Sequence, residues 1–199
     1  MADHGIWGAT YGRGYGGNWG TQGLDYYVLA KLLWDPRRDV EPIIDDYCRA
    51  AYGPGARAMK EYYRRAEDLT NRMAAAGKPN RDLDARIENA RNKLTDPYSD
   101  AELALLQACV DRAAAAIGSS DTASLERVRL VATGLEYTKK TRDLLTAAAD
   151  VRAGKSTRED FAKIKAETDQ YYGSLKGSLA VTVSRDIQSG LGLRPERRK

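Results

Sequence analysis

The feature that most constrains the fold is an apolar segment at residues 24–34, which has helical spacing and apolar side chains on every side. One side would carry Leu24, Tyr27, Val28 and Leu32, and the other Tyr26, Leu29, Ala30 and Leu33. A helix that is apolar all round is normally buried all round. Pro36 ends it, because proline donates no backbone hydrogen bond and disfavours helical geometry in the preceding residue. The sequence therefore predicts a core helix that needs more protein around it than the N-terminal segment supplies.

Residues 1–23, which precede this helix, alternate glycines with aromatic residues and are expected to form a loop. Glycine loses more backbone entropy on folding than any other residue and disfavours a regular helix. Such a segment is either a frayed terminus or a binding loop held by a scaffold. An aromatic ring can stack on the apolar face of a sugar while amide side chains bind its hydroxyls. The candidate sugar-binding residues are Trp7, Tyr11, Asn18, Trp19 and Gln22, unless the rings only pack over the apolar helix.

The rest of the chain reads as about six further helices in antiparallel order with short links. Asp39 is a candidate N-cap for the next helix and Gly53 its end. Capping boxes are expected at Ser99-x-x-Glu102 and Ser156-x-x-Glu159, and a long helix between them at about residues 122–153. The apolar stripe expected after Asp39 consists of Val40, Ile43, Ile44, Tyr47, Cys48, Ala51 and Tyr52. The core face expected after Ser99 consists of Leu103, Leu106, Cys109, Val110, Ala113 and Ile117. Shorter helices are expected at residues 82–94 and, as helix or strand, at 179–187.

Composition and charge argue against several classes of protein. The sequence has no apolar run of about 18 residues, which a membrane helix would need, and no signal segment at Met1. The net charge is +4 without a basic face interleaved with aromatics, so we expect no nucleic-acid partner and no membrane partner. Cys48 and Cys109 have no metal-ligand spacing and are expected to be buried, reduced thiols. We expect neither a metal nor a cofactor.

No catalytic residue can be assigned from the sequence. Residues 12–17 satisfy G-x-G-x-x-G, but no hydrophobic strand precedes them and no helix begins inside them, as a dinucleotide site requires. His4 is the only histidine, which leaves no nucleophile paired with a base. A glycosidase needs two acids about 5–10 Å apart, one with a raised pKa, and no such pair stands out among the carboxylates. Whether the chain is an enzyme is therefore left open.

The segment from residue 17 to residue 36 carries a resemblance to a known family, centred on Leu32-Leu33-Trp34-Asp35-Pro36. The pattern continues with Asp39-Val40, Asp46-Tyr47, Tyr52-Gly53 and Tyr62-Tyr63. Between about residues 5 and 67 the chain resembles the C-terminal part of a bacterial domain of unknown function found in glycoside-hydrolase-like proteins. That domain is related in architecture to alpha-glucuronidases and beta-N-acetylhexosaminidases.

The resemblance implies a mainly α chain that contains the last strand, loop and helix of a (β/α)8 barrel, followed by an antiparallel helical bundle. The last strand and loop would be residues 4–23, and the last helix residues 24–34. Because active sites of such barrels lie at the C-terminal ends of the strands, Trp7, Tyr11, Asn18 and Trp19 would flank a sugar pocket. The earlier strands, and with them the usual acid and base, are missing from this sequence.

Three domains follow from this reading: residues 1–34 as the end of the barrel, 35–77 as two helices flanking it, and 78–199 as a C-terminal helical domain with a basic tail. The first hypothesis is the C-terminal portion of a carbohydrate-active protein that contributes aromatic contacts to an oligo- or polysaccharide but not the catalytic acids. The alternative is a free-standing helical interaction or homo-oligomerisation module. Met1 is either a natural start or the edge of a fragment. If it is the edge of a fragment, the parent protein is expected to be secreted or periplasmic, so the compartment of this chain is left unassigned.

Overall fold

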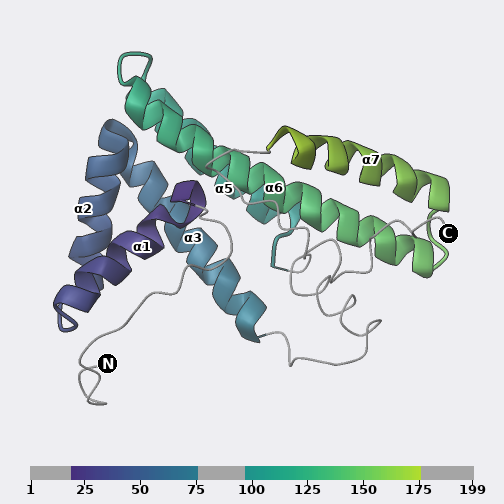
Figure 1. Cartoon of the computed structure of the whole chain (residues 1–199), viewed down its shortest axis with the longest axis horizontal. Helices are drawn as coiled ribbons and strands as arrows, with labels where there is room; N and C mark the ends of the chain where they lie inside the picture. The colour runs from purple at the N-terminus through teal and green to yellow at the C-terminus, as the bar shows by residue number, and fades with distance from the viewer. Residues whose placement is uncertain (1–18, 76–96, 176–199) are drawn as a thin grey trace. The chain divides into compact units, whose positions relative to one another are not determined.

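The computed structural model describes residues 19–75 and 97–175, and these residues are mainly helical, as predicted, with no strand among them (Figure 1). The helices are α1 (Trp19–Trp34), α2 (Val40–Tyr52), α3 (Ala56–Ala75), α5 (Asp100–Ile117), α6 (Thr122–Arg152) and α7 (Arg158–Ser174), with a 3-10 turn at Gly53–Gly55. The predicted barrel strand and the helices expected at 82–94 and 179–187 lie outside the described residues. The long helix expected at 122–153 is confirmed as α6.

The described residues divide into two compact units. The first unit contains residues 19–64 and 106–134, and the second contains residues 65–75, 97–105 and 135–175. Helices α3, α5 and α6 each contribute residues to both units. The predicted domain boundaries at residues 34 and 77 stay a prediction. No helix in the described ranges is both long and apolar enough to span a membrane.

In the first unit, α2 begins and ends where its sequence predicts. The Asp39 carboxylate accepts a hydrogen bond from the Glu41 backbone N–H at 3.1 Å, which satisfies one unpaired donor of the first turn. Gly53 ends the helix with a φ of +47°, a backbone conformation that favours glycine. Most of the predicted stripe is buried, including Cys48 and Tyr52. The prediction that Val40 is buried is wrong, because its side chain is 39% exposed.

The core of the first unit forms where the start of α3 meets the end of α5. Gly55 packs so closely on α5 that an added Cβ would lie 3.0 Å from the Ala113 carbonyl oxygen and 3.0 Å from Ile117. All six residues of the core face predicted for α5 are buried. Gly118 follows the last residue of α5 with a φ of +69°, a backbone conformation that favours glycine at the end of a helix.

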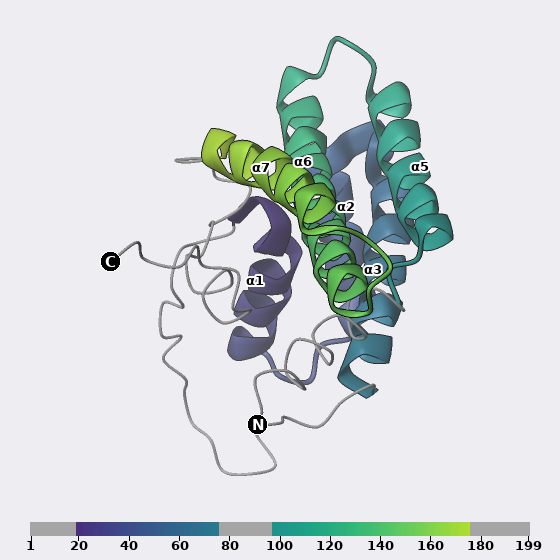
Figure 2. The same ribbon diagram turned by 90° about the vertical axis from the view of Figure 1, so that its right-hand side faces the viewer.

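In the second unit, α7 runs antiparallel to the C-terminal half of α6 in both views (Figures 1 and 2). The Tyr137 and Tyr172 rings lie 4.7 Å apart between centroids. The Tyr172 and Thr141 hydroxyls are 2.6 Å apart, and Thr141 donates its own proton to the Tyr137 carbonyl, so Tyr172 is the donor to Thr141. The same helix pair buries Leu144, Leu145, Thr168, Tyr172 and Leu175.

In the first predicted capping box, at Ser99, the hydrogen bond between the serine and the helix is present. The second box, predicted at Ser156, is wrong. Ser99 Oγ accepts from the Glu102 N–H at 3.3 Å. At α7, however, the N-cap is Thr157 rather than Ser156, and Asp160 closes the box with bonds in both directions. The physical reason is that the Ser156 N–H already bonds to the Asp150 carbonyl in the turn that ends α6, so the new helix cannot begin before Thr157.

The loop expected up to residue 23 is also partly wrong, because α1 begins at Trp19 and includes Gly20 and Gly23. Glycine propensity is a local preference of about 1 kcal/mol per residue, which packing in the folded protein can outweigh. Gly23 lies against the Tyr47 side chain of α2, so closely that the Cβ of any larger residue would collide with the Tyr47 hydroxyl. The tertiary contact between α1 and α2 thus extends the helix into the glycine-rich segment.

Candidate functional site

The surface of α1 is the feature of the described structure that most needs a functional explanation. Among its described side chains, only Leu24 is buried, with 8% of its surface exposed. Leu33 is 40% exposed and Trp34 91% exposed, so the predicted burial on every side is wrong within the described residues. The physical reason is that the contact of α1 with α2 leaves Ala30, Leu33 and Trp34, near the C-terminal end of α1, exposed.

Three exposed apolar residues lie at the end of α1 and the start of α2, and we call Leu33, Trp34 and Val40 the α1 corner. They are three of the four large apolar residues that are clearly exposed in the described ranges, the fourth being Leu105. Exposed single residues are ordinary, but a group that includes a tryptophan typically marks an interaction surface.

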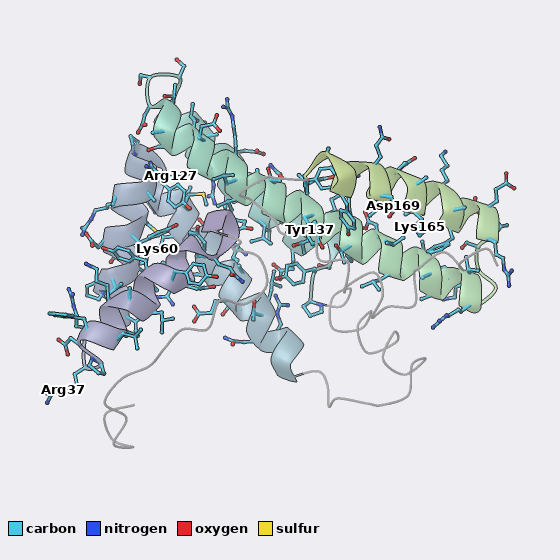
Figure 3. All side chains as sticks on the ribbon, in the orientation of Figure 1. Arg37, Lys60, Arg127, Tyr137, Lys165 and Asp169 are labelled. Carbon is cyan, nitrogen blue, oxygen red and sulfur yellow. The ribbon has the colours of Figure 1, made fainter. Side chains whose placement is uncertain are left out.

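Charged residues of both signs border the α1 corner. Asp35 accepts a hydrogen bond from the Arg37 backbone N–H at 3.2 Å, and Asp39 caps α2. The side chain of Arg37 projects away from the ribbon at the turn between the two helices (Figure 3). Arg38 is likewise exposed. Tryptophan and arginine are the residues most enriched at energetically important positions of protein interfaces, so this composition suits a docking surface.

The covered side of α1 is held to α2 by tyrosines. Tyr27 donates a hydrogen bond of 2.5 Å to the Asp46 carboxylate, and this bond is the main reason that the pKa of Asp46 lies below its usual value. Lys31 lies 4.9 Å above the Tyr27 ring centroid and lowers the same pKa further. The Asp46 carboxylate is therefore ionised at neutral pH and anchors α1.

Beneath this contact lies a phenol cluster, which consists of Tyr47, Tyr52 and Tyr63. The Tyr52 and Tyr63 hydroxyls are 2.6 Å apart, and the Tyr47 ring lies 6.0 and 6.2 Å from the two other rings. Burial raises the pKa values of Tyr52 and Tyr63 well above that of a free phenol. Both hydroxyls therefore stay protonated and hydrogen-bonded at neutral pH.

Ion pairs link α2 to α3 and α3 to α5 in the first unit. Lys60 pairs with Asp45 and, at 3.3 Å, with Glu41, and Figure 3 shows Lys60 between these helices. Arg112 of α5 bonds to Glu61 at 2.8 Å. These side chains are partly or largely exposed, so solvent screens the pairs and each contributes little to stability. The network orients the helices and is not a catalytic arrangement.

Of the predicted sugar-binding residues, Trp7, Tyr11 and Asn18 lie outside the described residues. Trp19 is the first residue of α1, and its side chain is not among those described. Gln22 is exposed on the first turns of α1, where its side-chain oxygen accepts a hydrogen bond of 2.9 Å from the Tyr26 hydroxyl. The structure thus identifies Tyr26 as a hydrogen-bond partner of Gln22, which lies four residues before it on the same helix.

No general acid emerges from the carboxyl groups with clear shifts. The pKa values of Asp46, Asp121 and Asp160 all lie below the usual value because the three groups accept hydrogen bonds from Tyr27, Ser124 and Thr157. Asp121 and Asp160 serve the N-termini of α6 and α7. Within the described ranges, no group of three or more histidine, cysteine or acidic residues could hold a metal ion. Cys48 and Cys109 are buried free thiols, as predicted, and burial raises the pKa of Cys48 to about 11.

One comparison with known proteins bears on this region. The family model of a domain of unknown function (DUF4838) matches residues 2–64. The match includes all of α1 and α2, the α1 corner and the phenol cluster. No curated protein and no solved structure matches the chain. The first third of the chain is therefore similar to a domain whose function is not known, and this part also holds the exposed surface of α1.

Proposed function

We propose that this chain is the C-terminal helical portion of a carbohydrate-active, glycoside-hydrolase-like protein. It would contribute aromatic sugar contacts and a helical structural domain, while the catalytic acids belong to a barrel portion outside this sequence. The observation that carries the proposal is that α1 is apolar on every side, yet it leaves Ala30, Leu33 and Trp34 exposed and most of its other apolar side chains only half-buried. As the last helix of a barrel, α1 would pack between the barrel and the helical domain.

The free energy at stake in that surface is considerable. Burial of one large apolar side chain contributes roughly 1.5–3 kcal/mol compared with its exposure. Leu33, Trp34 and Val40 are 39% exposed or more, and several other residues of α1 are only half-buried. A surface that covered this side of α1 would add several such contributions. The sequence of α1 is thus better suited to a covered helix than to the half-open one described.

The sugar contacts would come from the N-terminal end of α1 and the segment before it. Trp19 and Gln22 lie within one turn of each other on the helix, and Tyr26 orients the Gln22 amide through its hydroxyl. An amide held in this way presents its N–H₂ group to a ligand without a large loss of rotamer freedom. This supports a role for Gln22 as a donor to sugar hydroxyls beside an aromatic platform.

The proposal is tested by saccharide titration of the polypeptide that includes the barrel portion. Trp19→Ala should weaken saccharide binding about tenfold, which corresponds to about 1.4 kcal/mol, without change in helix content. Gln22→Ala should weaken it less. Gln107→Ala is the matched control, because Gln107 is also an exposed helical glutamine with a bond to the residue four positions on. Unchanged affinity in both Trp19→Ala and Gln22→Ala would contradict the proposal.

A second candidate function is self-association through the same helix. The observation that favours it is that charges of both signs, Asp35 and Asp39 beside Arg37 and Arg38, border the α1 corner, which suits a self-complementary two-fold interface. This candidate predicts a stable oligomer by light scattering, which Leu29→Asp dissociates. A monomer at every concentration would exclude it and leave the barrel portion as the partner.

A further inference from the structure

A single glycine fits α1 to α2. Gly23 lies so close to α2 that an added Cβ would be 2.5 Å from the Tyr47 hydroxyl oxygen, a distance that real Cβ atoms essentially never show. The next nearest atoms, Cζ and Cε2 of the same ring, would be at 3.5 and 3.9 Å, which are ordinary contacts. The conflict would therefore involve one oxygen atom only.

The Tyr47 ring has little room to move away from such a conflict. The ring centroids of Tyr27, Tyr52 and Tyr63 lie 5.5, 6.0 and 6.2 Å from that of Tyr47, and these neighbours belong to three different helices. Tyr27 is itself held by Asp46, and Tyr52 and Tyr63 by each other. Closely packed side chains respond to added volume by shifting backbone, not by rotating freely.

We propose that Gly23 and Tyr47 are positioning residues, which set where α1 lies on α2 and so where Gln22, near the start of α1, is presented. The Tyr47 hydroxyl limits how closely α1 can approach α2, because the neighbouring rings of Tyr27, Tyr52 and Tyr63 hold the Tyr47 ring in place. Only glycine, which has no Cβ, can lie this close to that hydroxyl. The consequence for sugar contact rests on the function proposed above. The contact itself does not, because it follows from the geometry of the two helices.

The proposal makes a prediction opposite in sign to ordinary helix propensity. Alanine normally stabilises a helix relative to glycine, so Gly→Ala at an unobstructed helical position should raise the melting temperature. Gly173→Ala on α7 is the matched control, since no neighbouring atom lies within 4 Å of the added Cβ. Gly23→Ala should instead lower the melting temperature by about 3 °C or more and speed amide exchange in α1 at least tenfold.

The decisive variant is the rescue. Tyr47→Phe removes the one atom in conflict, so Gly23→Ala combined with Tyr47→Phe should melt no lower than Tyr47→Phe alone and should regain its amide protection in α1. If Gly23→Ala does not fold, the double variant is still expected to fold. A stabilising Gly23→Ala would overturn the proposal, and so would a destabilising one that Tyr47→Phe does not rescue.

Saccharide titration separates this inference from the proposed function. If both are right, Gly23→Ala weakens saccharide binding and Tyr47→Phe restores it in the double variant. If rescue is seen in melting and exchange but no variant changes saccharide affinity, the positioning contact stands and its connection with sugar binding is overturned.

Discussion

Helices α1 and α5 have similar lengths but opposite relations to their surroundings. The six apolar residues on the predicted face of α5 are all buried, and its other side is largely exposed and polar or small. Helix α1 is apolar all round, yet Trp34 and Leu33 are exposed. An amphipathic helix specifies both its buried side and its exposed side. A helix that is apolar on every side specifies only that it should be covered, and the described residues cover it incompletely.

The largest difference between the two helices should be seen on removal of a leucine side chain. Leu106 of α5 is 1% exposed, so Leu106→Ala should lower the free energy of unfolding by about 2–5 kcal/mol through lost contacts and a cavity. Leu33→Ala in α1 should lower it by less than about 1 kcal/mol. Urea unfolding of both variants measures the difference. Equal losses would show that α1 is as deeply buried as α5.

The second prediction concerns the side of α1 that is covered. The phenol cluster beneath it contains Tyr52 and Tyr63, whose folded pKa values are raised above about 10, the value of a free phenol. Their contribution to stability is complete below pH 10 and is lost as the pH rises through 10 toward the folded values, because the unfolded chain releases these protons first.

We therefore expect the urea midpoint to fall steeply above pH 10. Tyr52→Phe is the control, since it has one titrating phenol fewer and should show a shallower fall. In the second unit, burial raises the pKa of Tyr172 to about 12, so its ionisation also lowers the stability of the folded chain as the pH rises above 10. A midpoint that is independent of pH between 9 and 11 would show that the phenols are open to water.

Helix ends extend the comparison with a smaller effect. Thr157→Ala removes the N-cap of α7 and should lower the free energy of unfolding by about 1 kcal/mol. Ser156→Ala, one residue earlier, should be close to neutral because the buried Ser156 hydroxyl has no hydrogen-bond partner within the described residues. Thermal unfolding of the two variants decides between Thr157 and the cap that the sequence pattern favours.

The smallest effect is expected at the most exposed residue. Trp34→Ser should change the free energy of unfolding by no more than about 0.5 kcal/mol, as at other surface positions. It should also raise the solubility of the chain, because the α1 corner loses its largest apolar group. Leu105→Ser is the control, since Leu105 is 44% exposed and lies outside the corner. A loss of several kcal/mol would mean that Trp34 is covered in the chain alone.

The sequence predicts these features to different degrees for physical reasons. The face of α5 and the cap at Asp39 could be predicted, because each depends on contacts that a local pattern encodes. The start of α1 at Trp19 could not be predicted, because it depends on Gly23 meeting Tyr47, which is distant in sequence. Thr157 was missed because the end of α6 uses the Ser156 N–H. For the candidate site, Gln22 stays a prediction, and its hydrogen bond to Tyr26 could be expected only once α1 was known to begin before Gln22.

The most direct test of the account is the solvent accessibility of Trp34. The chain has three tryptophans, so the double substitution Trp7→Phe and Trp19→Phe leaves Trp34 as the single tryptophan of the sequence. Acrylamide quenching is then compared between the chain alone and the longer polypeptide that includes the barrel portion. We predict that Trp34 is quenched readily in the chain alone and is protected in the longer polypeptide. Equal quenching in both would contradict the claim that α1 is a helix covered by the rest of a carbohydrate-active protein.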